Sequence, residues 1–223
     1  MFNTYICMKT DRLDKGVRER LLDTAEVLFA ADGYDHVSIR DITRYAQCNL
    51  AAVNYYFKGK QGLYLDVFRH HMIPRARRIR DFFWKRIKSE KKTTVETVVR
   101  ALTEAYMHGP LSQEEVEIHH KLMARELTNP TTALDMMVED VIRPFVAEVS
   151  ALLRPDLKSI SDEELLLDVI SVFALILYFT FGRLPISKVT GKEYTDKYRD
   201  KLVEHVTSFS LYGLGCNIKD KGT

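Results

Sequence analysis

Cysteine is scarce in this chain of 223 residues: there are three, Cys7, Cys48 and Cys216, widely spaced and odd in number. They form no C-x-x-C pair, so neither a disulfide framework nor a zinc site is expected. The chain also lacks a glycine-rich loop that would cradle phosphates and the G-x-S-x-G nucleophile motif. Because nothing supplies a nucleophile or an oxyanion hole, we expect no enzyme, no cofactor and no metal site.

Long hydrophobic runs are missing as well. The most apolar stretch, Leu165 to Phe181, is interrupted by Asp168, and the run that remains from Val169 has 13 residues. A membrane span needs roughly 20. The first residues lack the basic and apolar regions of a secretory signal. We therefore expect a cytoplasmic protein without a membrane span, and whether Met1 or Met8 is the start stays open.

The net charge of +2 hides an uneven distribution. Residues 1–92 carry 19 Lys and Arg against 11 Asp and Glu, which gives +8, and residues 93–223 carry 14 against 20, which gives −6. A basic half followed by an acidic half suggests that one end of the molecule meets a polyanion. Chance unevenness on solvated helix faces remains the alternative.

Helix signals dominate the chain, and strand signals are scarce. Apolar residues at helical spacing predict a first helix from about residue 15 to 32, which Gly33 ends. Pro74 is expected to break or kink a later helix. Further helices are expected at about 94–108, 112–128, 131–153, 162–182 and 194–213, with Gly182 to Gly191 as one of their separators. The sequence therefore predicts an all-α protein of about nine helices.

Residues 38–56 carry the pattern that is most informative about function. Ser38 and Asp41 form an acidic capping box that starts one short helix, and Asn49 is a good N-cap for the next. Two short helices joined by a tight turn are the geometry of a helix-turn-helix, whose second helix lies in the major groove of DNA. The exposed side of that helix combines small side chains with groups that can bond to bases or phosphates: Ala51, Ala52, Asn54, Tyr55 and Tyr56. On the pattern alone, an ordinary helical hairpin with half-buried tyrosines remains the alternative.

Three segments, residues 28–34 (LFAADGY), 37–42 (VSIRDI) and 55–63 (YYFKGKQGL), resemble the N-terminal domain of TetR-family transcriptional repressors. The match covers about residues 15–68 without a gap. It implies a homodimer on a palindromic operator, released when a small-molecule effector binds a C-terminal helical domain. Carried over position by position, it implies base contacts by Arg40, Leu50, Ala51 and Asn54, and phosphate contacts by Ser38, Ala52 (through its backbone), Tyr55, Tyr56 and Lys60.

The resemblance also divides the chain. It implies an N-terminal tail at 1–14, a helix-turn-helix DNA-binding domain at 15–62, and a ligand-binding and dimerisation domain at 63–223. We therefore expect a sequence-specific DNA-binding transcriptional regulator, most simply a repressor. The alternative is an all-α interaction module without DNA binding, which the +8 charge and the exposed polar set of the motif disfavour.

Two departures from the family pattern affect the reading of DNA. Gln47 stands in the turn where relatives usually have glycine, and a left-handed backbone there would cost roughly 1 kcal/mol. Leu50 and Asn54 stand where relatives often have polar and aromatic residues, so no relative's operator sequence can be assumed.

Farther along the chain, the segments 119–127 (HHKLMAREL), 129–131 (NPT) and 142–144 (IRP) resemble the CecR-like regulators. This second resemblance identifies no ligand.

An effector pocket is expected in the C-terminal domain. Residues on one face of the helix at 112–128 combine a histidine and a carboxylate with apolar neighbours, which suits a ligand site. The expected lining residues are His119, Met123, Glu126, Phe173 and Leu177. The alternative is that Glu126 pairs with an arginine such as Arg143 and is purely structural. A metal site at His119 and His120 is disfavoured, because adjacent helical residues diverge by about 100°.

Two other helical segments carry expectations about partners. The helix at 162–182 is apolar nearly all round, so it must be covered on every side, and the resemblance pairs it with the helix at 194–213 in a dimer interface. Burial within one monomer is the alternative. The run from Arg75 to Lys92 has nine Lys and Arg. It begins about 22 Å beyond Lys60 along a helix, so a solvated face is expected there rather than direct DNA contact.

Overall fold

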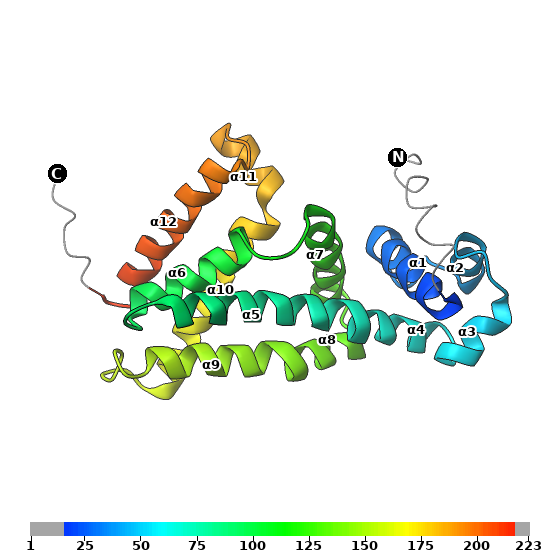
Figure 1. Ribbon diagram of the computed structural model, residues 1–223, viewed down its shortest axis with the longest axis horizontal. Coiled ribbons are helices and arrows are strands. Elements are labelled where there is room, and N and C mark those ends of the chain that lie inside the picture. The colour runs from blue at the N-terminus through cyan, green and yellow to red at the C-terminus, as the bar shows by residue number, and fades with distance from the viewer. Residues whose placement is uncertain (1–15, 217–223) are drawn as a thin grey trace. The chain divides into compact units, whose positions relative to one another are not determined.

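A computed structural model describes residues 16–216, and every regular element among them is helical. The expected N-terminal tail, Cys7 and the two candidate start residues lie outside the described residues. Between residues 16 and 216, twelve α-helical segments, with two π-helical turns each joining two of them, form ten continuous helices. This confirms the all-α class and comes close to the expected nine helices. Figure 1 shows the helices in chain order.

The chain divides into two compact units: unit 1 is Met1–Arg75 with Ser112–Val138, and unit 2 is Ala76–Leu111 with Glu139–Thr223. The described elements of unit 1 are α1 (Val17–Asp32), α2 (Ile39–Tyr45), α3 (Leu50–Phe57), α4 (Lys60–Val67), the π turn Phe68–Met72, α7 (Gln113–Thr128) and α8 (Thr132–Met137). Helix α5 (Ile73–Ser89) has its first three residues in unit 1 and the rest in unit 2. The expected domain boundary after residue 62 stays a prediction. Residues 112–138 pack with the N-terminal helices in unit 1.

Local sequence signals fix the short helices of unit 1. The Ser38 hydroxyl accepts a hydrogen bond from the Asp41 backbone N–H at 3.1 Å and so caps α2, and the Asn49 side chain caps α3 by accepting from the Ala51 N–H at 2.9 Å. Gly33 follows α1 with φ +87°. The buried core joins the inner faces of these helices and of α7: Leu21, Ala25, Phe29, Ile42, Val53, Leu63, Tyr64, Val67, Phe68 and Leu122.

Neither Pro74 nor Pro144 ends a helix. Of the two expectations for Pro74, a break or a kink, the break is therefore wrong. Each proline is the second residue of an α-helix that directly follows a π turn, Phe68–Met72 in one case and Val138–Ile142 in the other. A proline inside an α-helix lacks an N–H and crowds the carbonyl four residues before it. The wider π turn accommodates the proline, so the chain stays helical.

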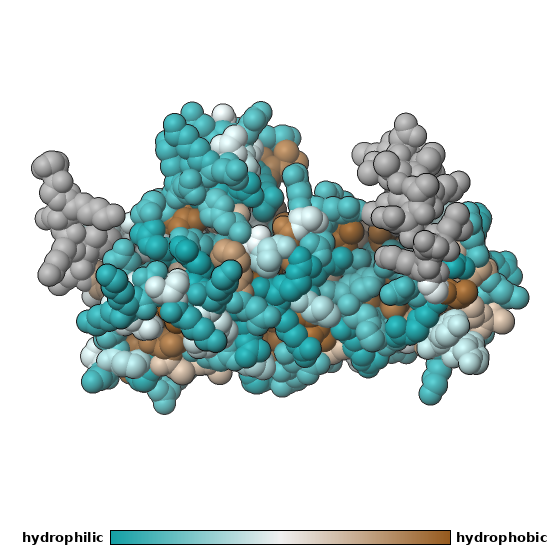
Figure 2. All heavy atoms as spheres, viewed as in Figure 1, coloured by the Kyte–Doolittle hydropathy of each residue, from teal (hydrophilic) through white to brown (hydrophobic). Residues whose placement is uncertain are grey.

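Unit 2 contains α6 (Val95–Met107), α9 (Arg143–Leu153), α10 (Asp162–Phe181), α11 (Arg183–Thr190) and α12 (Asp196–Gly213) besides most of α5. Its core gathers buried side chains from these helices, among them Phe83, Leu102, Phe145, Leu153, Val169, Ile176 and Val206. Helix α11 occupies the segment from Gly182 to Gly191 that was expected to be a separator, which is a correction. Figure 2 shows hydrophilic side chains over most of the face in view, with hydrophobic patches between them.

Helix α10 is buried on one face only. Val169, Phe173 and Ile176 are buried in unit 2, whereas Leu167 is 57% exposed and Ile170 46%. By length and mean hydropathy alone, α10 would suffice to cross a membrane, a test that the core helix of a soluble protein also passes. Within the described part of unit 2, one apolar face of α10 is left without a covering partner.

Candidate DNA-binding site

Helices α2 and α3 form the expected helix-turn-helix in unit 1. At the start of α2, the Ser38 hydroxyl donates to the Asp41 carboxylate at 2.5 Å, and this hydrogen bond, with the nearby positive charge of Arg44, lowers the pKa of Asp41. Arg44 donates to the same carboxylate at 2.8 Å. The first turn of α2 is therefore held by side-chain bonds that leave the Arg40 guanidinium exposed, with no partner among residues 16–216.

The turn between the two helices holds the left-handed residue that the sequence raised as a possibility. Gln47 has φ +52°, and Gln47 and Lys58 are the two non-glycine residues with positive φ between residues 16 and 216. The Cys48 N–H donates to the Thr43 carbonyl of α2 at 3.0 Å, and this hydrogen bond closes the turn on the end of α2. A side chain in this conformation costs roughly 1–2 kcal/mol. The turn thus takes a left-handed conformation at a residue that is not glycine.

Helix α3 presents the face that the sequence predicted. Val53 and Phe57 are buried against the rest of unit 1, while Tyr55 is 81% exposed and Leu50 47%. Ala51, Asn54 and Tyr56 are also exposed, and Ala52 is half-buried. The rings of Tyr55 and Tyr56 meet edge to face with centroids 4.9 Å apart. An exposed helix face of small, amide and phenol groups above a buried apolar face suits entry into a DNA groove.

Lys60 lies at the N-terminus of α4, where the helix has no side-chain cap. Backbone N–H groups without partners at a helix N-terminus favour a phosphate. The Lys60 ammonium lies 4.4 Å from the centre of the Tyr34 ring and donates to the Asp35 carbonyl at 3.4 Å. Nearby, a Cβ added to Gly62 would come within 1.8 Å of the Phe57 carbonyl oxygen. The ends of α3 and α4 therefore approach closely, which fixes Lys60 relative to α3.

Sequence reasoning missed the part that α7 plays in unit 1. The Arg125 guanidinium donates to the carbonyls of Ala30 at 3.3 Å and Ala31 at 2.5 Å, both in the last turn of α1. The neighbouring Glu126 accepts a hydrogen bond from the Tyr64 hydroxyl of α4 at 2.6 Å. Because these partners lie more than sixty residues away in the chain, no local pattern could reveal them. Helix α7 is therefore bonded to two helices that support the helix-turn-helix.

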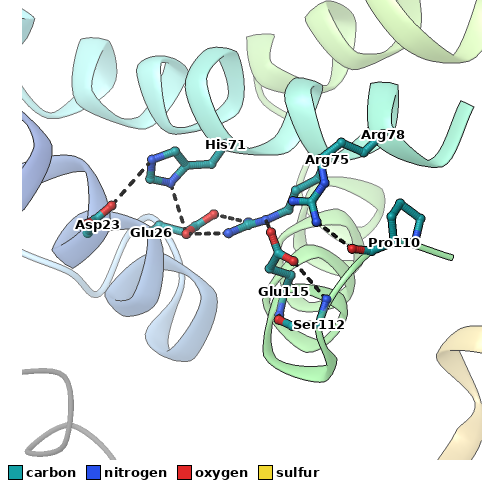
Figure 3. Close-up of polar contacts among 8 residues, drawn as sticks. All are labelled: Asp23, Glu26, His71, Arg75, Arg78, Pro110, Ser112 and Glu115. Atoms are coloured by element: carbon teal, nitrogen blue, oxygen red, sulfur yellow. Dashed lines mark hydrogen bonds and ion pairs between the residues drawn. The ribbon is translucent and has the colours of Figure 1, made fainter. Parts of the chain in front are cut away.

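A second connection in unit 1 is a network of charged side chains (Figure 3). Glu26 of α1 is buried and accepts two hydrogen bonds from Arg75, one of them at 3.0 Å, and the His71 ring lies 3.1 Å away. Burial raises the pKa of Glu26, but the bonds from His71 and Arg75 outweigh it, so the pKa is lowered. Arg75 also lies 3.6 Å from Glu115 of α7. The network thus joins α1, the segment after α4, and α7.

The expected effector residues are divided between the units: His119, Met123 and Glu126 lie in unit 1, and Phe173 and Leu177 in unit 2. Glu126 is buried, and its carboxylate already accepts hydrogen bonds within unit 1. Besides Tyr64, Thr131 donates to it through its backbone N–H at 2.9 Å and through its hydroxyl at 3.0 Å. Burial and the charge of Arg75 lower the pKa of His119 to about 4. The expected pocket stays a prediction.

The suggested ion pair between Glu126 and Arg143 is wrong. Arg143 instead pairs with Glu139 at 2.8 Å, four residues earlier on the same helical segment. The structural role suggested for Glu126 is favoured, but its donors are Tyr64 and Thr131 rather than an arginine.

The basic run of α5 is less of a free cationic surface than expected. Within unit 2, Arg86 pairs with Glu104 at 2.6 Å, and Arg80 pairs with Glu148 through two nitrogens. Arg78 donates to the Pro110 carbonyl at 2.6 Å (Figure 3). Several cations of this run therefore hold unit 2 together, which reduces the solvated face that was expected.

Among residues 16–216, no group of three or more His, Cys, Asp or Glu side chains is placed to hold a metal ion.

Comparison with known proteins agrees with this site. Residues 21–67 match the family model of bacterial regulatory proteins of the tetR family, and residues 95–214 match the model of the C-terminal domain of the HTH-type transcriptional dual regulator CecR. The CecR protein of Shigella flexneri is 25% identical over 199 residues, covering 86% of this chain and 87% of that protein. YttP of Bacillus subtilis, a probable HTH-type transcriptional regulator by its name, is 39% identical over 46 residues, about a fifth of each chain.

Solved structures show the same fold. The fatty acid degradation regulator FadR from Bacillus halodurans superposes with a TM-score of 0.61 at 19% identity, covering 92% of this chain and all of that one. A TetR-like transcriptional regulator from Rhodococcus sp. RHA1 gives a TM-score of 0.59 at 12% identity over 90% and 97% of the two chains. With both family models matched, the chain belongs to the TetR family of DNA-binding transcriptional regulators and carries a C-terminal domain of the CecR type.

Proposed function

We propose that this regulator binds a palindromic operator as a homodimer, with α3 of each subunit in a major groove. Arg40, Leu50, Ala51 and Asn54 would contact base edges. Ser38, the Ala52 backbone, Tyr55, Tyr56 and Lys60 would contact phosphates and set the register. The observation that carries the proposal is the division of α3 into a buried face at Val53 and Phe57 and an outer face of exposed small and polar groups.

Each proposed contact has a distinct chemistry. The Asn54 amide can donate and accept at once, which suits the N6 and N7 edge of adenine, and the free Arg40 guanidinium suits the O6 and N7 edge of guanine. Leu50 and Ala51 can pack against thymine methyl groups. Phosphate contacts supply most of the affinity and the dependence on salt, and base-edge contacts supply the specificity.

The proposed dimer uses α10 and α12. Seven large apolar side chains are left exposed on these two helices: Leu166, Leu167, Ile170, Tyr178, Phe181, Phe209 and Tyr212. An apolar surface of this kind is costly in water and is typical of a protein interface. A second copy of the chain would cover it and place two helix-turn-helix units on one duplex, as a palindrome requires.

The proposal includes a repressor that works in the cytoplasm and leaves its operator when a small-molecule effector binds. An effector can do this only if it binds the form that does not fit the operator more tightly than the form that does. Residues of the CecR-type domain would form its pocket.

Selection of bound sites from random DNA duplexes tests the proposal. The expected result is an enriched palindrome whose half-sites lie one helical turn, about 34–36 Å, apart, or a multiple of that distance. Such a result tests DNA binding, dimer symmetry and register together. Recovery of no enriched sequence would contradict the proposal and favour an interaction module. A single half-site without a symmetric partner would contradict the proposed dimer on a palindrome.

A further inference from the structure

The Lys60 side chain is held in one place before any DNA is bound. Its ammonium lies 4.4 Å from the centre of the Tyr34 ring, within the range of a cation–π interaction, and it donates to the Asp35 carbonyl at 3.4 Å. An ammonium has three N–H donors. One donor is used by Asp35 and the ring lies against the ammonium, so a donor remains for a phosphate oxygen.

The Tyr34 ring is itself held by aromatic neighbours. It meets the Tyr64 ring edge to face at 5.0 Å and lies 5.9 Å from the ring of Phe29. Tyr64 is buried and also packs edge to face on Phe29 at 4.9 Å. Edge-to-face pairs at these distances have preferred geometries, so Tyr64 limits where the Tyr34 ring can lie.

Tyr64 is in turn anchored by α7. Its hydroxyl donates to the Glu126 carboxylate at 2.6 Å, and burial together with this hydrogen bond raises the pKa of Tyr64. Glu126 also accepts from Thr131, so the carboxylate cannot turn away without losing several bonds. Arg125 ties the same turn of α7 to the end of α1. Contacts therefore run without interruption from α7 through two tyrosines to Lys60, all within unit 1.

We propose that Tyr34, held by Tyr64 and by Glu126 of α7, seats the Lys60 ammonium for a DNA phosphate. Tyr34 and Glu126 are thus positioning residues for operator binding, although neither touches DNA. The inference rests on the proposed phosphate contact of Lys60. It gives α7 a direct physical link to the DNA-contacting surface, through which a change at α7 would alter the affinity for DNA in general rather than the base preference.

The slope of log K against log salt concentration for operator binding tests whether Tyr34 positions the Lys60 ammonium, an arrangement called the seat below. Each phosphate contact contributes about 0.9 to this slope, and the proposed dimer makes one Lys60 contact per subunit, so Lys60→Ala should reduce its magnitude by about 1.8. Tyr34→Leu should reduce the slope by most of that amount, and the double variant should show no further reduction. Tyr34→Phe keeps the ring and should keep the slope of the unmodified protein.

The possible results separate the two ideas. If Lys60→Ala leaves the slope unchanged, the phosphate contact and the seat both fail. If Lys60→Ala lowers the slope but Tyr34→Leu does not, the seat alone fails and the DNA-binding function stands.

A spectroscopic measurement on the unmodified protein does not depend on how well Tyr34→Leu folds. Protons above an aromatic ring resonate upfield, so the ε-methylene signal of Lys60, assigned with Lys60→Ala, should lie upfield of the other lysine ε-methylene signals. Tyr64→Phe, which removes the bond to Glu126, should move this signal towards the others. Glu126→Gln keeps an oxygen acceptor for Tyr64 and should leave it in place. An unshifted Lys60 signal in the unmodified protein would overturn the seat, and a Tyr64→Phe signal identical to that protein's would overturn the link to α7.

Discussion

Replacing Gln47 by glycine should stabilise the protein. Gln47 holds φ +52° in the turn between α2 and α3, and its side chain is exposed, so little packing is lost when it is removed. A left-handed non-glycine residue costs roughly 1–2 kcal/mol. Glycine also gives the unfolded chain more conformational freedom, which lowers the free energy of unfolding by roughly 0.4–1 kcal/mol. The expected gain in the free energy of unfolding is therefore about 0.5–1 kcal/mol.

Thermal unfolding followed by circular dichroism can detect this gain. For a chain of this size, 1 kcal/mol shifts Tm by roughly 2–4 °C, so Gln47→Gly should raise Tm by about 1–4 °C. Gln47→Ala is the matched control, because it removes the same side chain but keeps the Cβ and with it the strain. A Tm that is unchanged or lower in the glycine variant, or that rises equally in the alanine variant, would refute the argument from backbone strain.

Three further predictions concern packing, pH and assembly. Gly62→Ala should destabilise the protein by roughly 1–3 kcal/mol in denaturant unfolding, because the added Cβ would meet the Phe57 carbonyl; unchanged stability would contradict the close approach. The pKa of His119 is lowered in the folded state to about 4, so the unfolded chain takes up its proton first as the pH falls below about 6.5. Stability should then decline from pH 6.5 to about 4 by up to roughly 3 kcal/mol, and His119→Gln should flatten that decline; an equal decline in both proteins would exclude His119 as its source. Light scattering should give a mass near twice 25.9 kDa, and Leu167→Lys on the exposed face of α10 should shift it towards one chain. A monomer before substitution would contradict the proposed dimer.

The sequence predicted the features that depend on near neighbours. Ser38 and Asn49 act as the expected N-caps because a cap needs only the two or three residues that follow it. The exposed and buried faces of α3 follow from helical periodicity in the same way. The apolar residues nearly all round α10 follow from the same periodicity, and Leu167 and Ile170 among them stay exposed.

Features that depend on distant residues could not be predicted. Charge alone offers an arginine such as Arg143 as one possible partner of Glu126, whereas the fold brings it Tyr64 from 62 positions earlier in the chain. The π turns before Pro74 and Pro144 were missed because proline predicts an interruption without specifying which kind of turn accommodates it. The packing of α7 on α1 could not be predicted either, because nothing in the composition of residues 112–138 indicates it.

The central claim, that the outer face of α3 reads base edges, is tested most directly by selecting operator sites with the unmodified protein and with Asn54→Ala in parallel. Loss of one bidentate amide contact should remove the preference at one or two base pairs in each half-site, by roughly 1–3 kcal/mol, and leave the other positions as selective as before. Weakening that is equal on all sequences, or a selected site identical to that of the unmodified protein, would contradict the claim.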